Sequence, residues 1–300
     1  MKNIFKVGAI AATMLVSASA VSGNLYLGLS DNSYDEGRFL GMADANTTTG
    51  EFTEFGFSQF LATSAYDVDA AGNLTGNVVD SNITSDLMAF GIPASGASLD
   101  GSSNVDLVMP NCALGQCDID ALSPLTPPLT GDAEGFLQTW DLQVEYHLVA
   151  DITSGVAQYS GGYIEFFFND FNDDSNDRSI LRADLTGSNT QAVNLDLFFD
   201  VTFAEAGFLF VDDGSGNFVD AGLLAASGEF VNFALDTNVN PPIPTTDELL
   251  LVTGADGVTR AIRQTTLDGS ITATVVPEPS AIALLGLSLI GFGVASRRRK

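Results

Sequence analysis

Positive charge is scarce in the body of this sequence. Between residues 24 and 276 there is no lysine, and the only cations are five arginines. Of the 38 acidic residues in the 300-residue chain, only Glu278 lies outside that segment, so 37 acids face five arginines and the formal charge is −32. Such a surface repels nucleic acid and anionic lipid, which argues against both as partners of the body, and it attracts cations.

Histidine and tryptophan are nearly absent. His147 is the only histidine, so nucleophilic catalysis has a single candidate base, and strand alternation places it on a polar face. No glycine-rich phosphate loop or zinc motif is present. Glycoside hydrolysis needs only two carboxylates, and Glu145 and Glu165 on neighbouring predicted strands are the candidates. One tryptophan argues against a stacked sugar cleft, so we expect a protein that is not an enzyme, with a polysaccharide-active hydrolase as a remote alternative.

No apolar run near the N-terminus is long enough to span a bilayer. Lys2 and Lys6 precede an apolar stretch that ends near Val16, and small residues follow through Ala20. About ten apolar residues are too few for a span, whereas this order of features is typical of an export signal. We therefore predict a signal peptide over residues 1–20, removed by signal peptidase.

The C-terminal apolar run is also short. Residues 281–295 carry no charge, and a basic tail follows, made of Arg297, Arg298, Arg299 and Lys300. A helix of that length rises roughly 22 Å, against a hydrocarbon core of about 30 Å. We expect a single hydrophobic helix that anchors the chain transiently, with its cations on the cytoplasmic side and the body outside.

A short motif precedes this run and identifies it. Pro277, Glu278 and Pro279, followed by the apolar stretch and the basic tail, resemble the PEP-CTERM sorting signal of Gram-negative bacteria. The resemblance implies an exosortase-type processing enzyme as partner. It also implies a precursor tethered to the inner membrane and final delivery to the cell envelope or extracellular matrix. A permanent membrane anchor without processing is the alternative.

The two cysteines are close together in the sequence. Cys112 and Cys117 lie in "NCALGQCD" with four residues between them. In an exported protein such a pair is read first as a disulfide, and a redox or zinc site would need further ligands. We predict a disulfide that pins a turn, because so short a loop gains little stability from closure.

The body has the periodicity of strands. In "DLQVEYHLV" (141–149) the even positions are apolar, and in "VNLDLFFDVTF" (193–203) the odd positions from Val193 to Phe203 form one apolar face. Such alternation predicts half-buried antiparallel strands. Further strands are predicted at 163–168, 207–211, 229–235, 248–252 and 270–276, with turn residues between them. We expect an all-β body, a β-sandwich or jelly roll, with no convincing amphipathic helix.

The domain organisation follows from these features. We expect the signal peptide over 1–20, an acidic extracellular body over 21–276 and the sorting signal over 277–300. A possible sub-boundary within the body is "LSPLTPPLTG" (122–131), which reads as a linker or long loop. The order of elements in the second half also resembles flocculation-associated PEP-CTERM proteins. That resemblance implies a secreted protein that promotes cell aggregation together with exopolysaccharide.

One acidic stretch is a candidate metal site. "NDFNDDSND" (169–177) contains four aspartates, namely Asp170, Asp173, Asp174 and Asp177. Calcium requires such a density of oxygen ligands, while a solvated acidic turn is the alternative. From the sorting-signal resemblance we predict a structural or adhesive protein of the cell surface or biofilm matrix. A calcium-dependent carbohydrate-binding module is the main alternative.

Overall fold

The computed structural model describes residues 23–30, 34, 46–92, 107–111, 134–153, 156–191, 194–229, 231–238 and 249–276. The predicted signal peptide, the predicted linker or loop at 122–131 and the predicted C-terminal helix lie outside the described residues.

Strands make up most of the described chain. They are β1 (Leu25–Leu27), β2 (Glu54–Val68), β3 (Leu74–Ser81), β4 (Leu107–Asn111), β5 (Trp140–Thr153), β6 (Val156–Asp170), β7 (Arg178–Gln191), β8 (Asn194–Ala204), β9 (Leu209–Asp212), β10 (Phe218–Asp220), β11 (Val231–Asn238), β12 (Leu250–Thr253) and β13 (Thr259–Val275). Two short α-helices accompany them, α1 (Thr84–Ala89) and α2 (Ala221–Ser227), together with a 3-10 turn at Asp174–Asn176. No helix in this part of the chain is long and apolar enough to cross a membrane.

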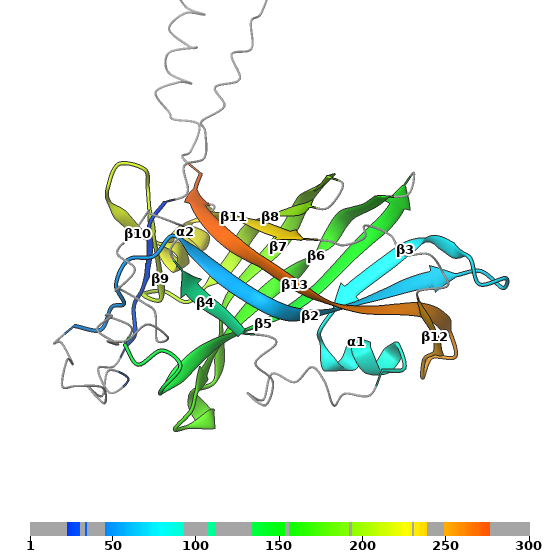
Figure 1. The fold of residues 1–300 in the computed structure, drawn as a ribbon. Helices are drawn as coiled ribbons and strands as arrows, with labels where there is room; N and C mark the ends of the chain where they lie inside the picture. Colours follow the sequence, from blue (N-terminus) through cyan, green and yellow to red (C-terminus); the bar gives the residue numbers. More distant parts are fainter. Residues whose placement is uncertain are drawn as a thin grey trace, which may run out of the picture.

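The larger sheet closes on itself. Its order is β12-β13-β11-β8-β7-β6-β5-β3-β2-β4, and β13 also pairs with β2, so eight strands form one antiparallel cylinder (Figure 1). The all-β prediction is confirmed, but the predicted sandwich or jelly roll is corrected, because one sheet is rolled up where two stacked sheets were expected. The alternation of apolar and polar residues predicts which side chains face inward. A closed cylinder and a sandwich of two sheets both satisfy that pattern, so the pattern does not distinguish them.

Two short strands share one position in the cylinder. β3 pairs with residues 64–68 of β2 and 147–151 of β5, while β4 pairs with residues 54–56 and 142–143 of the same strands. Asn82, directly after β3, bridges the interval between them. Its side-chain amide donates to the carbonyl of Val144 at 2.7 Å and accepts from the backbone N–H of Tyr146 at 2.8 Å. A buried side chain thus replaces missing ladder hydrogen bonds.

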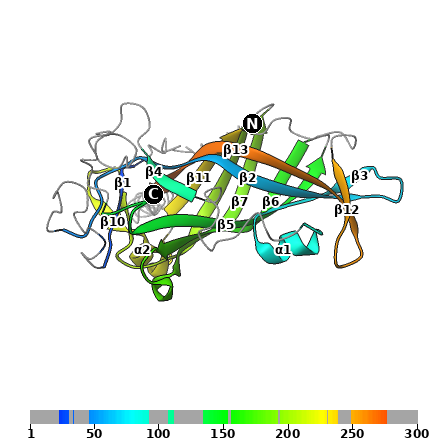
Figure 2. The ribbon, with the colours of Figure 1, turned by 60° about the horizontal axis from the view of Figure 1, so that its bottom comes forward.

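One end of the cylinder is filled by aromatic side chains and capped. The small sheet β1-β9-β10 and helix α2 lie at this end, opposite the β2–β3 hairpin and β12 (Figures 1 and 2). Beneath them Trp140 stacks on Phe168 with ring centroids 5.2 Å apart, and Phe136 packs edge-on against Trp140. All three are fully or almost fully buried. Aromatic packing of this kind closes one end of the interior to solvent.

The predicted strand faces are largely confirmed. The even positions from Leu142 to Leu148 are buried, as are Leu195, Leu197, Phe199 and Val201. Val193 lies outside the described residues, and Phe203 is an exception, because its side chain is 46% exposed. The register shifts between Arg182 and Ala183 of β7, leaving an extra residue in β8, so the alternation inverts and Ala204 is buried in place of Phe203.

Candidate functional site

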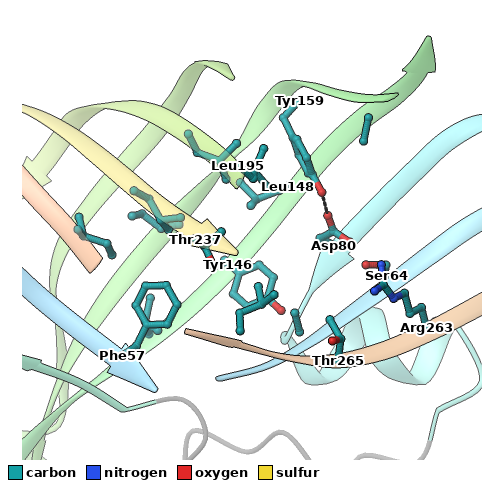
Figure 3. A pocket seen from close by; sticks show the side chains of 18 of the residues that line it. Phe57, Ser64, Asp80, Tyr146, Leu148, Tyr159, Leu195, Thr237, Arg263 and Thr265 are labelled. Atoms are coloured by element: carbon teal, nitrogen blue, oxygen red, sulfur yellow. Dashed lines mark hydrogen bonds between the residues drawn. The ribbon is translucent and has the colours of Figure 1, made fainter. Parts of the chain in front are cut away.

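The interior beyond the aromatic core holds a cavity of about 100 Å³. Most of its lining is apolar, from Val144, Leu148, Ile164, Leu195, Leu197, Leu235, Leu267 and Ile271 among others. Polar groups also reach it, and Figure 3 shows Asp80, Ser64 and Arg263 along one side of the cavity, with Phe57 and Thr237 on the other. An eight-stranded closed sheet is wide enough either to be filled by side chains or to hold one small ligand.

Asp80 on β3 is the central polar residue of this cavity. Its side chain is buried, with the residue only 7% exposed, and Oδ2 accepts a hydrogen bond from the hydroxyl of Tyr159. Oδ1 is buried and has no hydrogen-bond partner among the described residues. Burial raises the pKa of Asp80, and the nearby hydroxyls of Ser64 and Tyr159 and the charge of Arg263 oppose that rise only in part. Of these two hydroxyls, that of Tyr159 is the one within hydrogen-bonding distance of the carboxyl group.

Burial and the neighbouring carboxyl of Asp80 raise the pKa values of two tyrosines from different strands. Burial raises the pKa of Tyr159 well above its ordinary range, and the neighbouring Asp80 raises it further. Tyr66 on β2 behaves in the same way, with burial as the larger cause of its raised pKa and Asp80 as the smaller. Both phenols therefore remain neutral hydrogen-bond donors over the physiological pH range.

Two β-bulges bring these groups into the interior. On β6 the register shifts opposite Val149 and Ala150, so Tyr159 faces inward although it has the same parity as the outward-facing Tyr163. Gly162 makes this possible, since its φ is +117° and a Cβ there would collide with the carbonyl oxygen of His147. On β2 a second irregularity, opposite residues 267–269, switches the inward positions from odd to even numbers and places Ser64 and Tyr66 inside.

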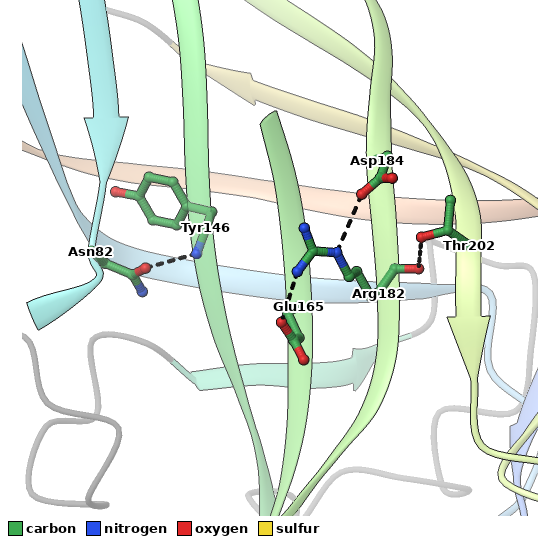
Figure 4. A network of polar contacts seen from close by, with 6 residues as sticks. All are labelled: Asn82, Tyr146, Glu165, Arg182, Asp184 and Thr202. Atoms are coloured by element: carbon green, nitrogen blue, oxygen red, sulfur yellow. Dashed lines mark hydrogen bonds and ion pairs between the residues drawn. The ribbon is translucent and has the colours of Figure 1, made fainter. Parts of the chain in front are cut away.

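The outer face of the cylinder holds the carboxylates considered for glycoside hydrolysis. Glu145 and Glu165 lie on neighbouring strands, as predicted, and the structure makes them direct cross-strand partners, but they lie outside the cavity. Glu165 Oε2 is 3.4 Å from Nη1 of Arg182, whose Nε also lies 3.3 Å from Asp184 (Figure 4). The same guanidinium lies 3.6 Å above the ring of Tyr163. This network binds neighbouring strands together on an open surface.

His147 also lies on the outer face, where the alternation predicts it. Its Nδ1 is 2.7 Å from Oδ2 of Asp86 at the start of α1, and the hydroxyl of Ser81 donates to the same oxygen at 2.7 Å. The carboxylate stands between the serine and the histidine. A base must contact the hydroxyl that it activates, and His147 contacts Asp86 in place of Ser81. These contacts therefore join α1 to the sheet and do not activate Ser81.

The predicted calcium residues lie at the end of β6 and in the turn that joins it to β7. Asp170 is buried and accepts from the backbone N–H of Asn172, the amide of Asn176 and the hydroxyl of Tyr34. Burial acts to raise its pKa, but these hydrogen bonds prevail and lower it. Asp177 accepts from the backbone N–H of Asp170.

The other two aspartates of the turn lie at its solvent-exposed tip. Asp173 caps the 3-10 turn by accepting from the backbone N–H and hydroxyl of Ser175, and Asp174 opens that turn. Within the described chain, no three acidic, histidine or cysteine residues are arranged to hold a metal ion. Calcium at residues 169–177 stays a prediction.

Several predicted site residues lie outside the described part of the chain. These are Cys112 and Cys117, the motif Pro277, Glu278 and Pro279, and the basic tail Arg297, Arg298, Arg299 and Lys300. Conversely, sequence reasoning missed Asp80 and Tyr159. The available signals were an acid within the strand-like "NVVDS" and the glycine pair after Tyr159, which marks a bulge.

Comparison with known proteins addresses the C-terminal segment. The family described as the PEP-CTERM protein-sorting motif matches residues 275–300, which include the proline-flanked acid, the apolar run and the basic tail. No curated protein and no solved structure is detectably similar to the chain. The motif implies an exported protein processed at the membrane by an exosortase. The match at residues 275–300 therefore supports a PEP-CTERM sorting-signal protein.

Proposed function

We propose that this exported PEP-CTERM protein acts at the cell surface or in the extracellular matrix, in a structural or adhesive role together with exopolysaccharide. Biofilm formation or flocculation would be the process that it serves. The sorting motif at residues 275–300 carries the proposal, since sorted cargo performs its task outside the cytoplasm. The body would then be the working part of the mature protein.

The surface charge supports an adhesive role. Three arginines form ion pairs with acidic residues: Arg178 lies 2.8 Å from Glu205, and Arg260 lies 2.8 Å from Asp256. Arg182 joins Glu165 and Asp184 as described above. The remaining carboxylates leave the exterior strongly negative. An anionic surface concentrates divalent cations, which can bridge it to acidic groups of an exopolysaccharide.

The closed sheet would protect an exported protein from unwanted association with other chains. Each of the eight strands of the cylinder is paired on both sides, so these strands offer no open edge for pairing with another chain. Acidic surfaces add to this protection, because like charges keep molecules apart in the absence of bridging ions. Aggregation of cells would then depend on ions and polymer, and would not require irreversible association of the protein itself.

Gene deletion tests the adhesive role. Cells that lack the gene should settle and aggregate less than the parent strain, and the full chain supplied in trans should restore aggregation. A matched truncated chain that lacks residues 277–300 should not restore it, because the body is then exported without being sorted. Aggregation that is unchanged by the deletion would contradict the adhesive role and leave export itself intact.

The second candidate is a calcium-dependent carbohydrate-binding module, and the oxygen-rich turn at residues 169–177 favours it. The purified protein should then be retained on purified exopolysaccharide in calcium and released by a chelator. Asp173→Asn combined with Asp174→Asn should weaken retention, because both residues lie at the exposed tip of the turn. Retention that withstands chelation would count against this candidate.

We propose no catalytic role for the body. Glu165 is held by Arg182, and both it and Glu145 lie on the outer face. Incubation of exopolysaccharide with the protein should release no reducing ends. Release that is abolished by Glu145→Gln or Glu165→Gln would establish the hydrolase in its place.

A further inference from the structure

We propose that the interior of the closed sheet binds a small, neutral, mainly apolar molecule that carries one hydroxyl group, with Oδ1 of Asp80 as the acceptor of that hydroxyl. The adhesive role rests on the exterior of the body and on the sorting signal. The two proposals can therefore fail independently.

The size of the cavity limits the ligand to about one ring. Its volume is about 100 Å³. An engineered protein cavity of roughly 150 Å³, lined by apolar side chains, binds benzene. Aliphatic side chains from several strands line most of this cavity in the same way, including Leu148, Ile164 and Leu197. The body of the ligand should accordingly be a compact ring or a branched aliphatic group.

One acceptor atom on the polar side of the cavity has no hydrogen-bond partner among the described residues. Tyr159 donates to Oδ2 of Asp80, whereas Oδ1 is buried with no partner among the described residues (Figure 3). A buried acceptor without a partner is unfavourable, because the hydrogen bonds that it makes to water in the unfolded chain are not replaced. A ligand hydroxyl placed against Oδ1 would remove that cost, so the orphaned atom specifies where the polar group of the ligand lies.

The charges around Asp80 favour a neutral ligand. Arg263 on β13 lines the same cavity and acts on Asp80 as a positive charge. The other titratable groups that face the cavity, Tyr66, Tyr146 and Tyr159, are phenols. A cationic amine would place a second positive charge in a water-poor interior, where an unpaired charge is costly to bury. A hydroxyl supplies the required donor without that penalty.

Phenol and toluene are the probes that separate these contributions. They have the same size and shape, and only phenol carries a donor. Calorimetric titration of the purified full chain should show both binding, with phenol at least roughly tenfold tighter, as expected for a hydrogen bond to a buried carboxyl group. Benzylamine, a cation at neutral pH, should bind more weakly than phenol.

Two variants assign the binding to this cavity. Asp80→Leu replaces the carboxyl by an apolar group of similar size, so the preference for phenol over toluene should disappear while toluene still binds. Ala62→Leu adds bulk to the cavity lining and should abolish binding of both. Ala234→Leu makes the same change on the outer face of β11 and should bind both probes as the parent does. Near-ultraviolet circular dichroism verifies the fold of each variant.

Three results would overturn the inference. Equal affinity for phenol and toluene in the parent protein would show that Asp80 accepts nothing from the ligand. A preference for phenol that persists in Asp80→Leu would place the hydroxyl elsewhere. Failure of the natively folded parent protein to bind either probe would mean that water alone satisfies Oδ1 and fills the cavity.

Discussion

Tyr159 donates a hydrogen bond to Oδ2 of Asp80 across the interior of the closed sheet, although the two residues lie 79 positions apart in the chain. They come from β6 and β3, which are not neighbours, because β5 lies between them. The contact forms because β6 carries a bulge that turns Tyr159 inward. A local irregularity in one strand therefore helps to create a polar centre in an interior that is mainly apolar.

The stability of the protein should depend on pH through Asp80. Burial raises its folded-state pKa above the ordinary value of about 3.9, so the folded state holds the proton more tightly than the unfolded state. The resulting stabilisation is present in full below the unfolded pKa and is lost as pH rises through the folded pKa. Asp80→Asn imitates the protonated carboxyl and removes the titration.

Urea denaturation at a series of pH values measures this effect. The free energy of unfolding of the parent, minus that of Asp80→Asn, should fall as pH rises from about 4 and level off above the folded pKa. A difference that stays constant between about pH 4 and 8 would contradict a raised pKa for Asp80.

Gly162→Ala should destabilise the protein strongly. The backbone there has a φ of +117°, and the new Cβ would collide with the carbonyl oxygen of His147. Strain and displacement of β5 should lower the free energy of unfolding by roughly 2–4 kcal/mol. Gly161→Ala is the matched control, because a Cβ at that position meets nothing within 4 Å. Equal losses in the two variants would refute the role assigned to the bulge.

Asn82→Ala should open the interval between β3 and β4. The change removes two hydrogen bonds to β5 and leaves the carbonyl of Val144 and the N–H of Tyr146 without these partners in the interior. We expect a loss of about 2–3 kcal/mol in the free energy of unfolding. Asn77→Ala, at an exposed position of β3, should cost less than about 1 kcal/mol. Hydrogen exchange of the Tyr146 amide should quicken only in the first variant.

The strands could be predicted well and their assembly could not. Alternating residues such as Leu142, Val144 and Tyr146 are buried as their pattern predicts, because burial on one face needs only the two-residue period of a strand. The pairing of β13 with β2 joins residues about 200 positions apart, and nothing in either strand alone specifies it. Closure of the sheet therefore had to come from the structure.

Bulges and helix ends account for the remaining differences. Phe203 faces outward because an extra residue in β8 inverts the alternation. Helix α2 was missed although Asp220 caps its start and Gly228 ends it in the left-handed conformation, two signals present in "DAGLLAASG". Asp80 could be read as a residue within a strand, but its position inside depends on partners from three other strands.

Intact mass spectrometry of the protein recovered from the cell surface or the medium tests the central claim most directly. That claim is that the segment matching the sorting motif is a processed delivery signal. The mature protein should therefore lack the basic tail Arg297–Lys300, and its mass should correspond to cleavage upstream of that tail. Secreted protein that still ends at Lys300 would contradict exosortase processing of this chain.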